Sequence, residues 1–229
     1  MIRKFLQDQR HVVLILFIIL CGIQISRDGI SLFYWLLLGV TTAGFLDFLL
    51  SYVFYRRLKV PKSGMISGFI VAGILSFYEP FYMVIIFSAV AVLSKYCIRY
   101  RQHHFLNPAG FALLIATLFH LPLSWMMESN AYLIILVGFY LAYRLKKAFH
   151  IVSFLAVFLT LMSLSRMNGF SIISWFFLFI MLIEQKTSGT GILRGIMFGA
   201  IAGVATYFSY RFLLLQYDYL MVGLLIANL

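Results

Sequence analysis

The stretch from residue 30 to residue 54, ISLFYWLLLGVTTAGFLDFLLSYVF, decides the class of this protein. It contains no basic residue and a single acidic one, Asp47, and basic residues lie just outside it at Arg27 and Arg56. A membrane-spanning helix needs about 20 predominantly apolar residues, so this run is long enough to cross a bilayer. Its length and composition therefore indicate a transmembrane helix.

The rest of the chain has the same character. Of its 229 residues, 63% are hydrophobic and only 11% are charged, whereas a soluble domain carries about 25% charged residues. This composition excludes an ordinary soluble enzyme, a disordered chain, a coiled coil and a secreted disulfide scaffold. We therefore expect an all-α polytopic membrane protein that forms a single integral membrane domain over residues 1–229.

Apolar runs between polar breaks give ten expected spans, joined by very short loops. Because so little of the chain is left outside the apolar runs, any chemistry has to occur in or at the bilayer. The expected spans lie near residues 11–26, 30–54, 64–78, 80–98, 108–126, 130–145, 149–165, 170–183, 192–210 and 217–229.

The basic residues give the orientation of these spans. With ten spans, 15 of the 18 Lys and Arg residues fall on the side of the N-terminus, and only Arg27, Arg166 and Arg211 fall on the other. Cytoplasmic loops carry such an excess, so we expect a multi-pass protein of the cell membrane with both termini in the cytoplasm. The net charge of +11 is then mainly an orientation signal, and no nucleic-acid partner is expected.

Two expected spans are too short to cross the bilayer comfortably. Residues 64–78 and 171–183 each cover only roughly 20 Å of an apolar layer about 30 Å thick. They are the third and eighth of ten, five spans apart, and an odd number of spans per half reverses the orientation of the second half. The pattern predicts a 5+5 inverted repeat with halves 1–127 and 128–229.

Glycines spaced by four residues predict close helix contacts in two of these spans. Gly64 and Gly68 open the third span, and Gly191, Gly195, Gly199 and Gly203 run through the ninth. In a 5+5 repeat the third span corresponds to the eighth. The glycine spacing instead makes the third span similar to the ninth, so it matches the inverted repeat imperfectly.

The stretch 95–111, KYCIRYRQHHFLNPAGF, combines basic residues, histidines and a helix start. Asn107 is a good N-cap and Pro108 suits the first helical position. One interpretation is a basic loop followed by a capped helix. The other is a phosphate or similar anion site at the helix N-terminus, with basic side chains supplied by Arg99, Arg101, His103 and His104.

Three further features have open interpretations. EQKTSGTG at residues 184–191 suits backbone N–H donation to a ligand or an ordinary tight turn, and it is not a full nucleotide-binding loop. Asp47 is a costly acid within a span, either functional or paired with Arg56. The two cysteines, Cys21 and Cys97, form no metal-binding pattern, and no metal is expected.

Several of these motifs occur in an order that resembles the RnfD/NqrB family, the membrane subunits of the Rnf electron-transport complex and of the sodium-translocating NADH:quinone reductase. The resemblance covers roughly residues 60–229. Its stretches are SGMISGFIVAGIL at 63–75, the Glu79-Pro80 turn, a span that ends near Lys95, HHFLNPAGFALL at 103–114, MLIEQKTSGTG at 181–191, the glycine-spaced RGIMFGAIAG at 194–203 and MVGLLIANL at 221–229.

The resemblance implies a ten-helix fold of two inverted five-helix repeats, like that of urea transporters, and flavin-associated electron transport. Family members carry FMN on a Thr of a Ser-Gly-Ala-Thr motif between the fifth and sixth helices. Here that connection is HLPLSWMMESN at 120–130 and lacks the motif, so any FMN or riboflavin is expected to bind without a covalent bond. The flavin or phosphate site is expected at Lys95, Asn107, Pro108, Thr187, Ser188 and Gly189.

The expected partners are the lipid bilayer and other electron-transport subunits or quinone. A rival hypothesis is a channel or transporter for a small solute, which uses the same inverted-repeat fold without redox chemistry. The two short spans and the missing covalent-FMN motif favour it. A third hypothesis is a structural or assembly subunit that binds no ligand of its own.

Overall fold

The protein is described by a computed structural model that covers residues 8–56, 60–100, 103–184, 187–189, 191–212 and 218–229. Nearly all regular structure in these residues is helical, as expected. The α-helices are α2 (Gln9–Asp28), α3 (Ile30–Tyr55), α4 (Lys62–Ile74), α5 (Phe81–Cys97), α6 (Pro108–Leu118), α7 (Ala131–Leu145), α8 (Ala148–Leu164), α9 (Ile192–Phe212) and α10 (Tyr219–Asn228).

Shorter elements join the helices. A two-residue hairpin pairs β1 (Arg99–Tyr100) with β2 (His103–His104) in antiparallel register. Single turns of 3-10 helix form η1 (Met126–Ser129) and η2 (Gly169–Ser171), and η3 (Phe177–Met181) is a π-helical segment.

Three helices in the described residues, α2, α3 and α9, are long and apolar enough to cross a membrane. A fourth span results if α7 and α8, which meet at a bend of 120°, are counted as one broken span. Together with the many large apolar side chains on the surface, these helices make this a helical membrane protein in contact with lipid. Ten spans, an inverted repeat and the orientation of the termini stay predictions.

Each expected apolar segment coincides with helical structure, but several helices are shorter than predicted. The expected span 108–126 is helical only to Leu118, because His120 adopts a left-handed backbone conformation (φ 60°) and Pro122 has no N–H to donate. Likewise, the helix in the expected span 64–78 ends at Ile74.

The two shortened helices end against each other. After α4 and α6, Leu75 and Leu123 form an isolated antiparallel bridge. The Ser76 N–H donates to the Pro122 carbonyl at 3.1 Å, and the Ser124 N–H donates to the Ile74 carbonyl at 2.7 Å. Extended backbone inside an apolar environment must find partners for its polar groups, and this pairing supplies them.

The expected span 170–183 is not one continuous α-helix. It consists of η2, a short stretch without regular structure and a helical segment that contains η3. The Glu128 carboxylate accepts the Trp175 N–H at 2.5 Å, and the Ser174 hydroxyl accepts the Phe177 N–H at 3.1 Å, so side chains cap the start of this segment.

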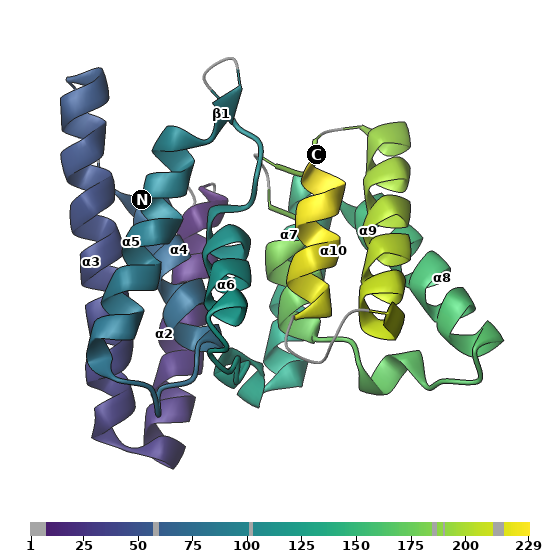
Figure 1. Ribbon diagram of the computed structural model, residues 1–229, viewed down its shortest axis with the longest axis horizontal. Coiled ribbons are helices and arrows are strands. Elements are labelled where there is room, and N and C mark those ends of the chain that lie inside the picture. The colour runs from purple at the N-terminus through teal and green to yellow at the C-terminus, as the bar shows by residue number, and fades with distance from the viewer. Residues whose placement is uncertain (1–7, 57–59, 101–102, 185–186, 190, 213–217) are drawn as a thin grey trace.

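Figure 1 shows how the helices are grouped. Helices α2, α3, α4 and α5 form one group, and α8 and α9 lie at the opposite side of the molecule, with α6 and α10 side by side between them. Helix α3 packs on α5 and α5 on α6, and in the same order α8 packs on α9 and α9 on α10.

Most of these glycines lie where helices approach closely, as their spacing predicted. Gly191 is the exception, since it precedes α9 with a φ of 106° and nothing lies within 4 Å of its Cβ position. A Cβ at Gly68 would meet the backbone oxygen of Gly39 at 2.5 Å, which places α4 directly on α3. A Cβ at Gly199 would clash with the His150 carbonyl oxygen, and one at Gly203 would lie 3.0 Å from the Phe154 carbonyl oxygen. The glycine spacing of the ninth span therefore serves its contact with α8.

Candidate functional site

A cavity of about 110 Å³ lies between α4 and the 177–184 segment, the two regions that were predicted as short spans. Its walls come from α2, α4, the start of α6, α7 and the 177–184 segment, so both predicted halves contribute. The lining residues are Gln9, Arg10, Val13, Ser63, Ile66, Ser67, Ile70, Asn107, Ala109, Leu141, Leu145, Phe179, Ile180, Ile183 and Glu184.

The lining is mostly apolar with a few polar groups. Ile66, Ile70 and Phe179 form apolar walls, and the buried side chains of Ser67 and Asn107 add hydrogen-bonding groups. Small-molecule sites in proteins have this composition, in which apolar walls give affinity and a few polar groups fix orientation. The cavity is therefore the candidate functional site.

Asn107 is the predicted site residue that lines this cavity. The chain reaches it from the β1–β2 hairpin through two residues, Phe105 and Leu106, and its side chain is only 2% exposed. As predicted, Asn107 caps α6, because its side-chain oxygen accepts the Gly110 N–H at 2.9 Å, and Pro108 occupies the first turn. Its amide nitrogen donates to the Met181 carbonyl over a long 3.5 Å contact, which leaves donor capacity beside the cavity.

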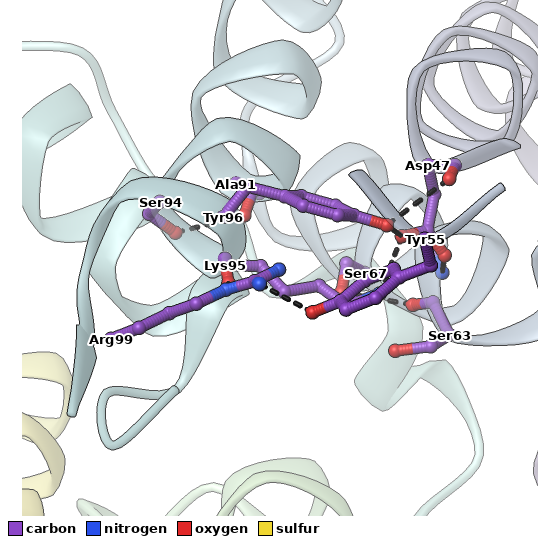
Figure 2. Close-up of polar contacts among 10 residues, drawn as sticks. Asp47, Tyr55, Ser63, Ser67, Ala91, Ser94, Lys95, Tyr96 and Arg99 are labelled. Atoms are coloured by element: carbon purple, nitrogen blue, oxygen red, sulfur yellow. Dashed lines mark hydrogen bonds and ion pairs between the residues drawn. The ribbon is translucent and has the colours of Figure 1, made fainter. Parts of the chain in front are cut away.

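Lys95 lies near the end of α5 and makes a buried ion pair instead of lining the cavity. Its ammonium lies 2.6 Å from the Asp47 carboxylate of α3, and each side chain is less than a tenth exposed. Figure 2 shows Lys95 and the Tyr96 hydroxyl converging on Asp47, and that hydroxyl donates to the carboxylate at 2.8 Å. Asp47 therefore pairs with Lys95, whereas Arg56 was the partner considered from the sequence.

The same carboxylate fixes the start of α4. Its second oxygen accepts the Gly64 N–H at 2.9 Å, in the first turn of that helix. A carboxylate at a helix N-terminus satisfies a free N–H and interacts favourably with the helix dipole. Since Ser63, Ile66 and Ser67 of α4 line the cavity, Asp47 positions one of its walls.

Arg99 was a candidate for binding an anion near Asn107, and two of its nitrogens donate to other groups. Its Nε donates to the Lys95 carbonyl at 2.7 Å, and its guanidinium hydrogen-bonds the Tyr55 hydroxyl and lies over the Tyr96 ring at 4.5 Å. Arg101 lies outside the described residues, as does the side chain of His103. The described residues thus give no assembled anion site at the start of α6.

A second buried lysine, Lys147, holds the 187–189 loop from the connection between α7 and α8. It is 1% exposed, and its amine donates to the Ser188 hydroxyl at 2.9 Å and to the Gly189 carbonyl. His150 lies in the next turn, and its Nε2 is 2.6 Å from the Ser188 carbonyl oxygen. Burial lowers the pKa of Lys147 to about 8.

This loop is connected to the cavity through Glu184. The Ser188 hydroxyl donates to the Glu184 carbonyl at 2.6 Å, and the Thr187 hydroxyl donates to the Glu184 carboxylate at 3.3 Å. Thr187, Ser188 and Gly189 therefore make protein contacts next to the cavity, and they do not line it. Thr190 of the same motif lies outside the described residues.

The predicted site residues thus fall into three places. Asn107 lines the cavity and Pro108 begins the helix behind it. Lys95 supports α4 through Asp47, and the 187–189 loop supports the opposite wall.

Sequence reasoning missed Lys147 and His150 as structural partners. Their signal was a lysine and a histidine three residues apart at the start of an apolar segment, which places both on one helical face. The basic residues there were interpreted only as an orientation signal, so the contact with the loop was not predicted.

A comparison with models of known protein families finds no match for the chain, and a comparison with curated proteins finds none either.

Proposed function

We propose that this chain is a membrane subunit resembling the RnfD/NqrB family, and that it takes part in flavin-associated electron transport at the cavity. The observation that supports this is that stretches far apart in the sequence come together in the fold. Three stretches that carry the resemblance, 63–75, 103–114 and 181–191, are far apart in the sequence, and each of them lines the same cavity.

The proposal includes ten spans in two inverted halves, 1–127 and 128–229, with both termini cytoplasmic. Two features support the repeat. The expected fifth and tenth spans, α6 and α10, are both short helices, and their N-caps Asn107 and Asp218 accept backbone N–H groups. The packing order α3–α5–α6 also recurs as α8–α9–α10, which are the second, fourth and fifth spans of each half.

The lining fits a flavin in chemical character. Ile66, Ile70 and Phe179 suit the faces of a flat ring system, and Ser67 and Asn107 suit its polar edge. When bound, a flavin supplies the ability to accept and pass on electrons, and the donor and acceptor are proposed to be other electron-transport subunits or quinone. The cavity of about 110 Å³ would enclose only part of such a molecule, and the rest would extend beyond the cavity.

The test is whether flavin co-purifies with the protein. The protein is purified in detergent, with and without added FMN or riboflavin, and its absorption and flavin fluorescence are recorded. We expect non-covalent flavin that is lost in Asn107→Ala. Asn130→Ala is the matched control, since Asn130 caps α7 through the Leu133 N–H in the same way and does not line the cavity. Absence of flavin in every preparation argues decisively against electron transport.

A second candidate function, a channel or transporter for a small solute, is favoured by the size of the cavity. Its volume of about 110 Å³ lies below the roughly 300–1,000 Å³ of ordinary cofactor pockets and suits a molecule of a few heavy atoms. Flux of urea, ammonium or a small anion into proteoliposomes tests it. A flux that Ser67→Leu abolishes supports this function, and equal flux with empty liposomes rejects it.

A further inference from the structure

The contacts of Lys147 determine which protonation state fits its surroundings. The His150 Nε2 must carry a hydrogen, because the carbonyl oxygen of Ser188, at 2.6 Å, can only accept. The other ring nitrogen, Nδ1, is buried and has no hydrogen-bond partner among the described residues. A protonated imidazole would leave a second N–H without an acceptor, so His150 is neutral with its hydrogen on Nε2.

This tautomer leaves the Lys147 amine facing an N–H group. The amine nitrogen lies 3.3 Å from Nε2, in addition to its contacts with the Ser188 hydroxyl and the Gly189 carbonyl. An ammonium has three N–H groups and no lone pair, so it cannot accept from Nε2. A neutral amine has two N–H groups for the two oxygens and turns its lone pair toward Nε2, so that no N–H of the amine opposes the imidazole N–H, which donates to the Ser188 carbonyl.

The charges around Lys147 agree with this assignment. It has no acidic partner within ion-pair distance among the described residues. Among the described residues, the charged groups that contact the 187–189 loop are the Glu184 carboxylate, which accepts from Thr187, and Arg194 of α9, whose side chain lies beside Gly189. A buried ammonium without a carboxylate partner is costly, and the neutral form avoids that cost.

We propose that Lys147 is a positioning residue that, as a neutral amine paired with His150, fixes the cavity wall formed by Phe179, Ile180, Ile183 and Glu184. The connection runs from Lys147 to Ser188, from Ser188 to the Glu184 carbonyl, and from there to the wall. The effect of this positioning on function rests on the proposed function of the cavity. The positioning of the wall by Lys147 is independent of that proposal.

The pH dependence of stability gives a signature that ordinary packing lacks. The pKa of Lys147 is about 8 in the folded protein and about 10.4 in an unfolded chain, so the neutral amine is its main form in the folded protein only above about pH 8. Because the folded pKa is the lower one, the unfolded state binds more protons between these values, and stability rises as the pH increases from about 8 to about 10.4.

The first experiment measures the melting temperature of the detergent-solubilised protein between pH 7 and pH 10. We expect the wild-type melting temperature to rise by at least about 2 °C more than that of Lys147→Met. Lys146→Met is the matched control, since Lys146 is the exposed neighbour in the chain, and it should keep the wild-type profile. Identical profiles for wild type and Lys147→Met overturn the proposal.

The second experiment measures the position of the wall. Ile183→Cys, in a Cys97→Ser background that removes the exposed native cysteine, is labelled with a maleimide at one fixed pH above the Lys147 pKa of about 8. Adding Lys147→Met should raise the labelling rate about five-fold or more, because the wall loses its support, and adding Lys146→Met should not. An unchanged rate overturns the proposal. If Lys147→Met does not fold, Lys147→Gln, a neutral donor, replaces it and should keep labelling slow while the pH-dependent rise disappears.

Neither readout requires a bound ligand. Their failure therefore counts against the positioning role alone, and absence of flavin and solute flux counts against the proposed function alone.

Discussion

Two buried lysines hold opposite walls of the cavity, and they do so in different ways. Lys95 is paired with the Asp47 carboxylate, which also accepts the first-turn N–H of Gly64 in α4. Lys147 contacts only uncharged groups, which belong to Ser188, Gly189 and His150. The first wall therefore depends on an ion pair and the second on neutral hydrogen bonds.

The difference matters because a charge inside an apolar protein is tolerated only with a partner. Removal of one member of a buried pair leaves the other charge uncompensated, whereas loss of a neutral donor costs only its hydrogen bonds. The two lysines look equivalent in the sequence, but they should respond to mutation by different amounts.

Asp47→Ala should cause the largest loss of stability. It leaves the Lys95 ammonium and the Gly64 N–H without this acceptor, and the Tyr96 hydroxyl keeps only the main-chain carbonyl of residue 47. We expect a loss of about 3–5 kcal/mol in the free energy of unfolding, compared with about 1–2 kcal/mol for Lys147→Met, which removes neutral hydrogen bonds when the pH is above the Lys147 pKa of about 8. Unfolding in mixed detergent and SDS, followed by tryptophan fluorescence, measures both. Equal losses in the two variants would contradict the contrast drawn between the walls.

Replacing both members of the ion pair should recover most of that loss. In Asp47→Leu combined with Lys95→Met no charge is left unpaired, and apolar replacements of buried ion pairs are often neutral. The double variant should lie within about 1–2 kcal/mol of wild type, and the remaining cost comes from the Gly64 N–H, which still lacks an acceptor. The double-mutant cycle provides the measurement, and additive losses from the two single variants would show that the charges are not coupled.

Glycine substitutions test how rigid each wall support is. A Cβ at Gly64 would lie 2.5 Å from the Asp47 Cβ and 2.7 Å from the Ala43 carbonyl oxygen, so backbone has to move. A Cβ at Gly195 meets the His150 ring at 2.6 Å, and a side chain can move more easily. We expect Gly64→Ala to cost about 2–3 kcal/mol and Gly195→Ala about 1 kcal/mol in the same unfolding assay.

Gly22→Ala is the control for this comparison, since nothing lies within 4 Å of its Cβ position. It should be neutral or slightly stabilising, because alanine favours the helix. If Gly195→Ala proves more harmful than Gly64→Ala, the support around His150 is the more rigid one.

The sequence located the helices well because apolar length and capping residues act locally. Asn107 and Pro108 marked the start of α6 correctly, and the glycine spacing of α9 identified a close helix contact. Helix ends that fall inside apolar runs could not be predicted from the sequence. The run after Leu118 stays apolar while the chain leaves the helix to pair with the residues after α4, and that choice depends on a partner about 50 residues away.

The candidate site was predictable only in part for the same reason. Asp47 stood out as a costly acid, but its partner Lys95 is 48 residues away, and spacing along one helix suggested Arg56 instead. Thr187, Ser188 and Gly189 had the composition of a ligand loop, but a buried lysine from another connection occupies their polar groups. Residue type indicates which groups need partners, and the tertiary fold decides which partners they receive.

The smallest expected effect concerns a third lysine, Lys62, which pairs with Asp8 near the surface. The two charges are 2.8 Å apart, and their side chains are 26% and 39% exposed. Exposed pairs contribute about 0.2–1 kcal/mol, so Lys62→Met should cost less than about 1 kcal/mol, and the cost should shrink at high salt. The hydrogen bond from Lys62 lowers the pKa of Asp8, so this contribution is present at neutral pH and is lost as the pH falls through the lowered pKa.

Unfolding at low and high salt, at pH 7 and in acid, measures this contribution. Lys62→Met leaves the Asp8 cap on the Arg10 N–H in place, so the variant isolates the ion pair from the helix cap. A loss as large as that of Asp47→Ala, or one that salt does not reduce, would mean that exposure does not explain the difference between this pair and the buried one.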